Sequence, residues 1–386
     1  MPDLFETGPA GWALAAAALV GTLGLALFLG ALGATWRQCY RVSHPPRVAS
    51  GRDPSRVGLP WEPFAVRTRD GKRLSGWLIP PPGEAGPGCR RDGQEPGGGQ
   101  PSSCGRQHSQ GDGGEAGRSG PGGPALVVMC HFLGGGKESL LRHGQYLWRA
   151  GFGVALFDFR CHGQSQGYPF WRFKLDLDLE AVLDHVLRRF APHAPRLAVM
   201  GLSMGASAAV LVAARRPEVQ ALVLDSGPLV LARDYFDRLF SLTGLPAWPC
   251  HGLFCALFLG LGGFQRLSHL VRRAMAGFSP RPALFIHGER DQVITRENSD
   301  QMFELLDSPG KEYWRVPGSY HLTAYALHPQ EYAGRVVGFL QRALAPAGPD
   351  GRGKPASAGA GPGPPPPEAG QPAVAEARAA ARSEGR

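Results

Sequence analysis

The sequence predicts an α/β fold whose mostly parallel sheet is covered by helices on both faces, preceded by a helix long enough to span a membrane. Two patterns predict it. From residue 125 onward, short apolar runs alternate with segments of helical periodicity, which is typical of parallel strands joined by crossover helices. Near the N-terminus, an uncharged apolar stretch is longer than a strand or an ordinary core helix requires.

The uncharged stretch runs from Trp12 to Ala34. As a helix it would be about 34 Å long, enough to cross the roughly 30 Å hydrocarbon core of a bilayer. A cleaved signal peptide carries positive charge before a shorter apolar run, whereas Asp3 and Glu6 precede this one. We therefore expect a leading segment over residues 1–11, a retained transmembrane helix over 12–34 and a linker over 35–60.

Basic residues follow the expected span, at Arg37, Arg41 and Arg47. Lysine and arginine are enriched on the cytoplasmic side of membrane helices. The sequence therefore predicts a single-pass membrane protein whose remaining chain lies on the cytoplasmic face.

The first strands are expected as a hairpin over residues 62–79. Phe64, Val66 and Thr68 alternate with other residues, and Asp70-Gly71 supplies a tight turn. Apolar runs suited to buried parallel strands follow at 125–129, 153–157, 197–200, 221–224, 283–286 and 313–316. Helical segments are expected at 137–150, 173–189, 204–215, 298–306 and 329–344.

Three stretches depart from this alternation. Residues 81–124 and 346–386 are rich in glycine and proline and poor in large apolar residues, which predicts a disordered insertion and a disordered tail. Residues 231–278 have an apolar centre too short to span a membrane and are expected to form a helical cap over the strand ends. The folded domain is then expected over residues 61–345.

Charge and cysteine content exclude some classes of protein. The net charge is +9 and the pI about 9.4, but no dense block of lysine and arginine is present. We therefore expect no nucleic-acid partner and, at most, a weak attraction to anionic lipid head groups. The seven cysteines form no CxxC pair and show no metal-ligand spacing, so neither a metal nor another cofactor is expected.

Two segments fit the pattern Gly-x-Ser-x-Gly, one around Ser203 and one around Ser165. In the nucleophile elbow a strand runs directly into a helix, and the serine lies on the strained turn between them. Ser203 has an apolar run before it and a helix of small residues after it, whereas Gly-Tyr-Pro closely follows Ser165. We therefore predict Ser203 as the nucleophile, with Ser165 as the weaker alternative.

A nucleophilic serine needs a general base, and the base needs an acid that orients it. Asp291 and His321 each come shortly after an expected strand, at the edge of the sheet where ligand crevices form. The chain order serine, acid, histidine matches that of enzymes with a nucleophile elbow. Asp225 and Glu289 are the alternatives for the acid, and a structural loop histidine is the alternative for His321.

The oxyanion of the reaction needs two backbone N–H donors. Met204, which follows the nucleophile, is expected to supply one. The turn over residues 131–136 contains three consecutive glycines and is expected to supply the other, unless it is only a flexible loop. His162 lies in a turn dense with polar side chains and is expected to brace the site rather than act as the base.

Together these motifs resemble those of the α/β-hydrolase superfamily, especially its membrane-anchored α/β-hydrolase domain proteins and its serine-aminopeptidase-like (S33-type) branch. The resemblance covers about residues 61–345, without 81–124. It rests on the turn at His131, Asp158-x-Arg160-x-His162-Gly163-x-Ser165, the Ser203 elbow, Gly288-x-x-Asp291-x-x-Ile294 and His321. It implies a triad of Ser203, Asp291 and His321, with Leu133 and Met204 as the oxyanion donors.

Two residues differ from the pattern of that family. Phe132 replaces the usual glycine of the oxyanion turn, and Cys161 replaces a glycine of the Arg-Gly-His-Gly turn. Phe132 is therefore expected to narrow the acyl pocket or to alter the turn.

The function predicted from these residues is hydrolysis of an ester, thioester or amide through an acyl-enzyme. An apolar cap beside a membrane anchor favours a small-molecule acyl or lipid substrate. The alternatives are an impaired enzyme that acts as a binding module, with Phe132 blocking the oxyanion hole, and a membrane scaffold that acts through the prolines at 364–367.

Overall fold

The computed structural model describes residues 9–45, 47, 51–84, 123–167, 174–191 and 195–346. Nearly all of the expected insertion 81–124 and of the expected tail 346–386, including the prolines at 364–367, lies outside the described residues.

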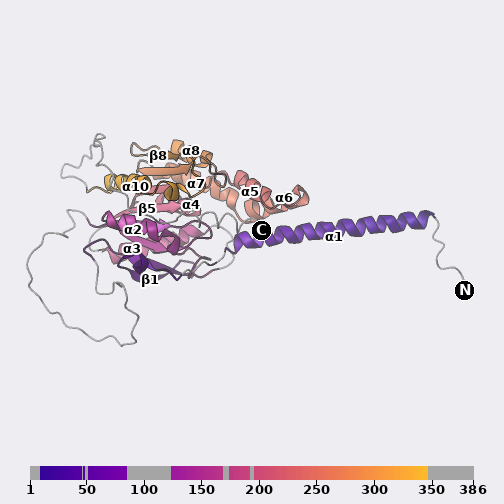
Figure 1. The fold of residues 1–386 in the computed structure, drawn as a ribbon, viewed down its shortest axis with the longest axis horizontal. Helices are drawn as coiled ribbons and strands as arrows, with labels where there is room; N and C mark the ends of the chain where they lie inside the picture. Colours follow the sequence, from indigo (N-terminus) through magenta and orange to yellow (C-terminus); the bar gives the residue numbers. More distant parts are fainter. Residues whose placement is uncertain are drawn as a thin grey trace, which may run out of the picture. The chain divides into compact units, whose positions relative to one another are not determined.

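An eight-stranded sheet with the order β1-β2-β4-β3-β5-β6-β7-β8 forms the centre of the described chain (Figure 1). The expected hairpin is present as the antiparallel pair β1 and β2, and β2 also pairs antiparallel with β4. All other neighbours are parallel, which confirms the predicted mostly parallel sheet. The strands are β1 (Glu62–Arg67), β2 (Arg73–Ile79), β3 (Ala125–Cys130), β4 (Gly153–Phe157), β5 (Arg196–Leu202), β6 (Val219–Asp225), β7 (Ala283–Gly288) and β8 (Glu312–Val316).

Helices follow most of these strands, as the alternation predicts. They are α2 (Leu141–Arg149), α3 (Leu175–Arg189), α4 (Met204–Ala213), α7 (Phe264–Phe278), α8 (Arg296–Leu305), α9 (Ala324–Leu327) and α10 (Pro329–Ala343). One predicted helix start differs: residues 137–140 form a 3-10 turn before α2. The reason is that the backbone N–H of Lys137 donates to Asp158 Oδ1, so the start of this segment is held by a loop carboxylate.

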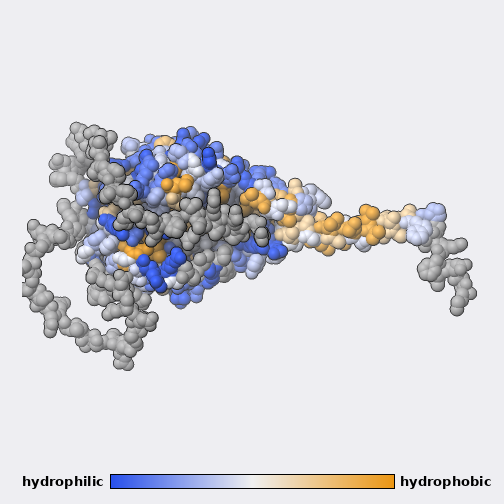
Figure 2. Space-filling view, in the orientation of Figure 1, coloured by the Kyte–Doolittle hydropathy of each residue, from blue (hydrophilic) through white to orange (hydrophobic). Residues whose placement is uncertain are grey.

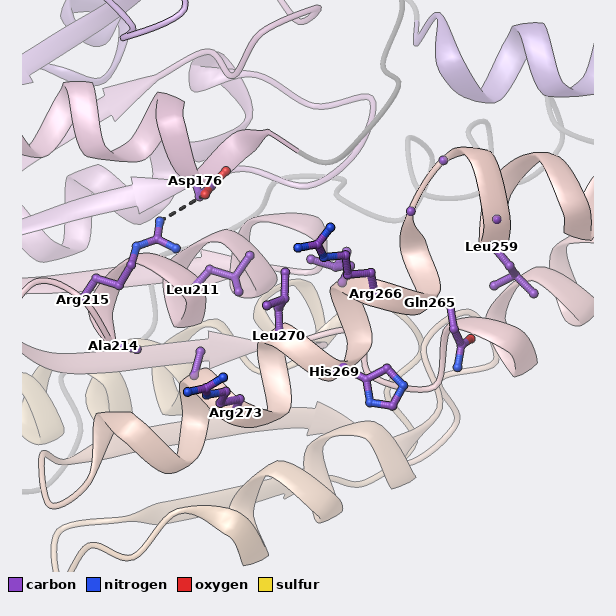
Figure 3. Close-up of a pocket in the computed structure, with 15 residues that line it drawn as sticks. Asp176, Leu211, Ala214, Arg215, Leu259, Gln265, Arg266, His269, Leu270 and Arg273 are labelled. Atoms are coloured by element: carbon purple, nitrogen blue, oxygen red, sulfur yellow. Dashed lines mark hydrogen bonds and ion pairs between the residues drawn. The ribbon is translucent and has the colours of Figure 1, made fainter.

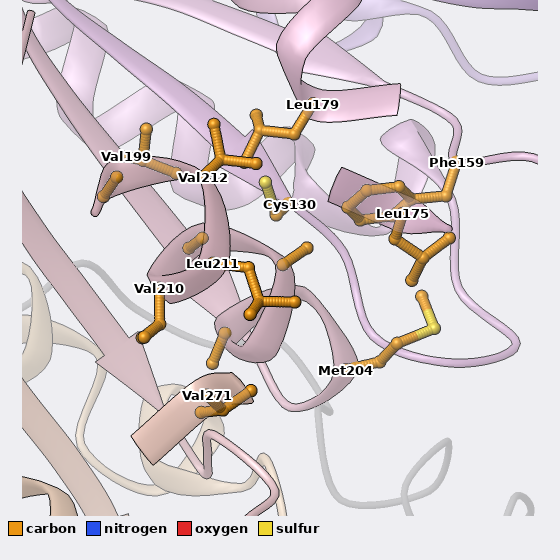
Figure 4. Close-up of a cluster of buried hydrophobic side chains, with 14 of the residues drawn as sticks. Cys130, Phe159, Leu175, Leu179, Val199, Met204, Val210, Leu211, Val212 and Val271 are labelled. Atoms are coloured by element: carbon orange, nitrogen blue, oxygen red, sulfur yellow. The ribbon is translucent and has the colours of Figure 1, made fainter. Parts of the chain in front are cut away.

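Both faces of the sheet are buried under helices. On β3, Leu126 and Val128 belong to one apolar cluster, whereas Val127 and Met129 belong to a second cluster on the opposite face. Helices α3, α4 and α7 contribute to the first cluster, and α2 and α10 to the second. Figure 4 shows the first cluster around α4, with β3, β5 and α7 contributing side chains. Alternating burial to both sides explains why the strands read as continuous apolar runs.

Helix α1 (Pro9–Ser43) continues beyond the expected span, so residues 35–43 are helical rather than a linker. Thr35, Cys39 and Ser43 are buried along one side of these last turns, and burial stabilises the extra helix. The hydroxyls of Thr35 and Ser43 donate to carbonyl oxygens one turn earlier, which satisfies them locally.

The preceding part of α1 exposes large apolar side chains, and Figure 2 shows a hydrophobic surface along this helix. They are Trp12, Leu14, Leu19, Val20, Leu23, Leu25, Leu27, Phe28 and Leu29. By length and composition this helix is able to cross a membrane.

The expected cap over 231–278 is helical but divides into two parts. Helices α5 (Ala232–Ser241) and α6 (Ala247–Cys255) are followed by a π-helical segment (Ala256–Leu261). Helix α7 instead packs Val271, Met275 and Phe278 into the cluster around α4. It therefore belongs to the layer of helices on the sheet, and we keep the name cap for residues 232–261.

Candidate active site

Ser203 lies on the turn between β5 and α4. Its backbone has φ 51° and ψ −112°, a strained conformation for a residue with a side chain. A Cβ atom at Gly201 would lie 2.5 Å from Gly205 O, and one at Gly205 would lie 2.3 Å from Cys130 O. Only glycine fits at both positions, so the Gly-x-Ser-x-Gly pattern is a steric requirement of this turn.

The structure brings the three predicted site residues into one hydrogen-bonded chain. His321 Nε2 lies 2.9 Å from Ser203 Oγ, and His321 Nδ1 lies 2.7 Å from Asp291 Oδ2. Asp291 and His321 reach this place from the loops that follow β7 and β8, beside the end of β5. Residues 118 positions apart thus meet at the carboxyl edge of the sheet.

Hydrogen bonds fix the charge and direction of the Asp291 carboxylate. Its Oδ1 accepts from the backbone N–H groups of Val293 and Ile294, at 2.9 and 3.0 Å. Burial alone would raise the pKa of Asp291, but hydrogen bonds from His287 and His321 outweigh it and hold that pKa below its usual range. The ionised Asp291 accepts a hydrogen bond from the Nδ1–H of His321, which leaves the Nε2 lone pair free to accept the proton of Ser203.

His287 is a residue of this site to which the sequence reasoning gave no role. It is fully buried at the end of β7, with Nε2 2.8 Å from Ile294 O and 3.3 Å from Asp291 Oδ2. Its Nδ1 lies 2.7 Å from Ser299 Oγ. His287 therefore holds the loop that carries Asp291. Its place in the His-Gly-x-x-Asp segment was the signal available in the sequence.

The turn after β3 lies beside Ser203, since its Leu133 lines the same small cavity. The N–H groups of Gly134, Gly135 and Gly136 donate to His162 Nε2, Phe132 O and Ser139 Oγ. The N–H of Leu133 donates to no group in the described part of the chain. At the start of α4, the N–H of Met204 has no partner within the helix. The resemblance implied these two N–H groups as the oxyanion donors, and this assignment stays a prediction.

Two buried histidines hold this turn in place. His131 Nε2 accepts from Phe159 N–H at 3.0 Å while its Nδ1 donates to Phe132 O at 2.7 Å. His162 Nε2 accepts from Gly134 N–H at 3.2 Å while its Nδ1 donates to Arg160 O. Burial lowers the pKa of both rings, which keeps each neutral with one donor and one acceptor nitrogen. Each ring therefore ties the turn to the segment after β4.

A buried ion pair lies directly after the turn over residues 131–136 and stabilises it. Lys137 is 1% exposed, and its Nζ lies 2.5 Å from Asp158 Oδ2. Asp158 also accepts from the backbone N–H groups of Lys137 and Gln164. Removing one partner of a buried ion pair is strongly destabilising, because the other charge is then left buried without a partner. The pair therefore holds the oxyanion turn against the loop after β4.

The alternative residues of the sequence analysis lie outside the hydrogen-bonded chain. Ser165 is fully buried, and its Oγ donates to Asp158 O and accepts from Ser75 N–H. Asp225 accepts from Tyr332 Oη and Ser226 Oγ, so its oxygens are occupied away from His321. Glu289 is exposed to solvent. Each has a structural or solvated position rather than a place in the chain from Ser203.

Phe132 was expected to narrow the acyl pocket or to alter the turn, but it does not line the cavity beside Ser203. Its ring packs against the apolar cluster on the α2 and α10 face, whereas Leu133 packs into the other cluster and lines the cavity beside Ser203. Phe132 is not among the residues that line that cavity. Cys161 has φ 68°, a left-handed conformation that explains why a glycine is usual at this place.

A small cavity of about 50 Å³ lies beside Ser203. Its walls are almost entirely apolar, and they come from the elbow, the oxyanion turn, the cap, α7 and helix α1. They are Val42, Leu133, Met204, Ser207, Leu229, Tyr235, Phe236, Phe264, Leu267 and Ile294. Val42 lies in the last turn of α1, so the end of this helix forms part of the site.

A larger hollow of the described chain lies elsewhere. It has a volume of about 1040 Å³ and is lined mainly by α7, α4 and the end of the cap (Figure 3). Arg215, Arg266 and Arg273 are among its residues, and Ser203 is not. Its size therefore does not identify it as the site of the chemistry.

Comparisons with known proteins support the same reading of the fold. The family model described as serine aminopeptidase, S33, matches residues 124–251, a range that contains Ser203 but neither Asp291 nor His321. The uncharacterised protein YfhR of Escherichia coli strain K12 is 24% identical over 294 residues, covering 74% of this chain and 84% of that protein. The chain is also similar to solved α/β structures.

Two of these structures are informative about the fold. The Pyrococcus furiosus esterase Pf2001 aligns over 79% of this chain and 99% of its own, with 23% sequence identity and a TM-score of 0.57. The α/β hydrolase GrgF from Penicillium sp. sh18 aligns over 74% of this chain and 100% of its own, with 20% identity and a TM-score of 0.51. Together with the sheet order, these likenesses establish the α/β-hydrolase fold.

Proposed function

We propose that the chain is a membrane-anchored serine hydrolase of the α/β-hydrolase superfamily, which cleaves an ester, thioester or amide through an acyl-enzyme. The observation that carries the proposal is the hydrogen-bonded chain from Ser203 Oγ through His321 to Asp291. Two backbone N–H groups, those of Leu133 and Met204, complete the arrangement that acyl transfer requires.

In the proposed mechanism, His321 Nε2 takes the Ser203 proton as Oγ attacks the acyl carbon. Asp291 stabilises the imidazolium that forms, since its carboxylate remains ionised beside Nδ1. The N–H groups of Leu133 and Met204 donate to the oxyanion, and the helix dipole of α4 favours the negative charge there. His321 then protonates the leaving group and activates a water that releases the acyl group from Ser203.

The walls of the cavity favour an acyl chain as the group next to the reacting carbon. Apart from the hydroxyls of Ser203, Ser207 and Tyr235, the lining side chains are apolar, so a charged substituent would lose its hydration for few partners in return. The described cavity is small, and a long chain would require the cap to move away from Phe264. A lipid or other acyl substrate is therefore proposed.

Contacts between α1 and the cap support a site that lies next to the membrane. The rings of Phe28 and Trp248 are 6.3 Å apart, and Cys250 Sγ lies 3.5 Å from Ala31 O. Phe28 and Ala31 belong to the expected transmembrane span, so the tip of the cap reaches the depth of that span. Trp248 at this tip and Leu242 at the end of α5 are each 82% exposed. We propose that both side chains insert into the bilayer.

The orientation of the anchor follows from the basic residues after the span. Arg37 and Arg41 lie on the last turns of α1, and Arg47 follows it. We propose a single pass with the catalytic domain on the cytoplasmic face.

The proposal is tested with two esters, one soluble with a short acyl chain and one embedded in the membrane with a long acyl chain. Purified full-length protein in vesicles is expected to hydrolyse both a soluble short-chain ester and a long-chain ester embedded in the same vesicles. Changing Trp248→Ser together with Leu242→Ser is expected to lower kcat/KM roughly tenfold for the embedded ester only. Tenfold corresponds to about 1.4 kcal/mol. This is only part of the roughly 1.5–3 kcal/mol that full burial of each large apolar side chain contributes, because the transmembrane helix still holds the variant on the membrane.

Leu305→Ser is the matched control, because Leu305 is 42% exposed on α8. It should leave both rates unchanged. Absence of turnover on both esters by folded protein contradicts the hydrolase. An equal loss on both esters in the double variant contradicts insertion of the cap.

A further inference from the structure

Three side chains of the types that can bind a metal ion lie close together in the cap, away from Ser203. Asp237 lies on α5, and His251 and Cys255 lie one turn apart on α6. His251 Nε2 is 2.8 Å from Asp237 Oδ1, Cys255 Sγ is 3.4 Å from His251 Nε2, and Cys255 Sγ is 3.6 Å from Asp237 Oδ1. Within the ranges that the structure describes, this is the one group of three such residues whose ligand atoms meet.

The arrangement differs from a second catalytic triad. In a Cys-His-Asp triad the acid binds one ring nitrogen and the nucleophile binds the other. Here both Asp237 Oδ1 and Cys255 Sγ approach the same nitrogen, His251 Nε2. One ring nitrogen cannot transfer a proton from the thiol while it donates to the carboxylate. Three donor atoms around one point are instead what a metal ion requires.

The distances agree with a tetrahedral zinc ion. Zinc–sulfur bonds of about 2.3 Å and zinc–nitrogen or zinc–oxygen bonds of about 2.0–2.1 Å place sulfur about 3.6 Å, and oxygen about 3.4 Å, from the nitrogen ligand. The distances from Cys255 Sγ to His251 Nε2, 3.4 Å, and to Asp237 Oδ1, 3.6 Å, lie within about 0.2 Å of the roughly 3.6 Å expected between sulfur and either ligand. The distance between Asp237 and His251 is shorter, at 2.8 Å, because a hydrogen bond now joins them. A small side-chain shift would open it.

We propose that Asp237, His251 and Cys255 bind a Zn²⁺ ion that joins α5 to α6. A thiolate, an imidazole and one carboxylate favour zinc over magnesium or calcium, which prefer oxygen ligands. All three side chains are partly exposed, so the ion has an entry path and its fourth position is open to water. Trp248 lies three residues before His251, across a kink at the start of α6, so the ion would fix the helix from which the proposed lipid-facing tip of the cap extends.

This site escaped the sequence analysis, which expected no metal. His251 and Cys255 are four residues apart along α6, but Asp237 belongs to another helix, and no spacing rule connects them. Only the packing of α5 on α6 brings the third ligand into place.

The test is zinc binding by the full-length protein in detergent, after removal of metal with a chelator. Wild-type protein is expected to bind one more equivalent of zinc than Cys255→Ser or His251→Ala, as measured by elemental analysis after dialysis. Its midpoint of thermal unfolding is expected to rise with zinc, while those of the two variants stay constant. Loss of a direct ligand should weaken zinc affinity by more than the roughly 10–100-fold that outer-shell changes cause.

His269→Ala is the matched control, because His269 is exposed on α7 and has no part in the cluster. It should bind as much zinc as the wild type. Asp237→Asn, which keeps the shape of the side chain, serves if the other variants lose their cooperative unfolding transition. Equal zinc content in wild type and variants would overturn the proposal. Ser203→Ala should bind zinc normally, so the outcome is independent of the hydrolase.

Discussion

Replacing Ser203 by alanine is expected to lower kcat for ester hydrolysis by about 10⁴- to 10⁶-fold. The range is that of serine enzymes that lose the nucleophile but keep the oxyanion donors. The variant should fold normally, since alanine removes only the Oγ of Ser203, whose hydrogen bond goes to the half-buried His321. Initial rates at saturating concentrations of the soluble ester give kcat directly.

Ser165→Ala is the control for this measurement, because Ser165 also lies in a Gly-x-Ser-x-Gly segment. Its Oγ joins Ser75 N–H to Asp158 O and is fully buried, so its loss should reduce the midpoint of thermal unfolding. The kcat of the folded fraction should fall less than tenfold. Substantial residual activity in Ser203→Ala would assign the nucleophile to another residue.

Replacing Asp291 by asparagine is expected to lower kcat by about 10⁴-fold. The amide group would present a donor to His321 Nδ1, in place of the carboxylate that now lies 2.7 Å away. The imidazole would then carry its proton on Nε2, where it cannot accept the proton of Ser203. A pH series of kcat checks this, since the wrong tautomer should keep the rate low at every pH.

Glu289→Gln is the matched control, because Glu289 was an alternative acid and is exposed two positions before Asp291. It should retain the wild-type kcat. A loss in Glu289→Gln as large as that in Asp291→Asn would contradict the assignment of the acid.

The charge of Asp291 also links the site to stability in acid. Its pKa is lower in the folded state than in an unfolded chain. The resulting stabilisation is complete above the usual aspartate pKa of about 4 and is lost as the pH falls through the lower folded pKa. The Asp291→Asn protein lacks this contribution. Its free energy of unfolding should therefore decrease less than that of the wild type between pH 5 and pH 2, by the amount that one carboxyl group contributes.

Much of the fold followed from local pattern. Apolar runs of strand length gave the parallel strands because a sheet buried on both faces needs apolar residues at every position. The same locality separated Ser203 from Ser165, since only Ser203 has a strand before it and a helix after it. The end of α1 could not be predicted this way, because the burial of Thr35, Cys39 and Ser43 depends on their packing in the folded domain.

The contacts that position the residues of the candidate site could not be predicted from the sequence. His287 faces Asp291 only because the loop after β7 turns back over the strand end. The neutral rings of His131 and His162 bridge two loops, and nothing in their spacing shows which nitrogen accepts. Val42 enters the cavity from a helix more than a hundred residues before the elbow. Such pairs depend on tertiary packing, so a single sequence does not specify them.

The most direct test of the proposed nucleophile is labelling with a fluorophosphonate probe, which reacts covalently with activated serines. Full-length wild type, Ser203→Ala and Ser165→Ala would be compared in detergent-solubilised membranes, with the labelled peptide identified by mass spectrometry. We predict stoichiometric labelling of wild type and Ser165→Ala on Ser203, and none of Ser203→Ala. Folded wild-type protein that stays unlabelled, or a label on any other serine, would contradict the proposed serine hydrolase.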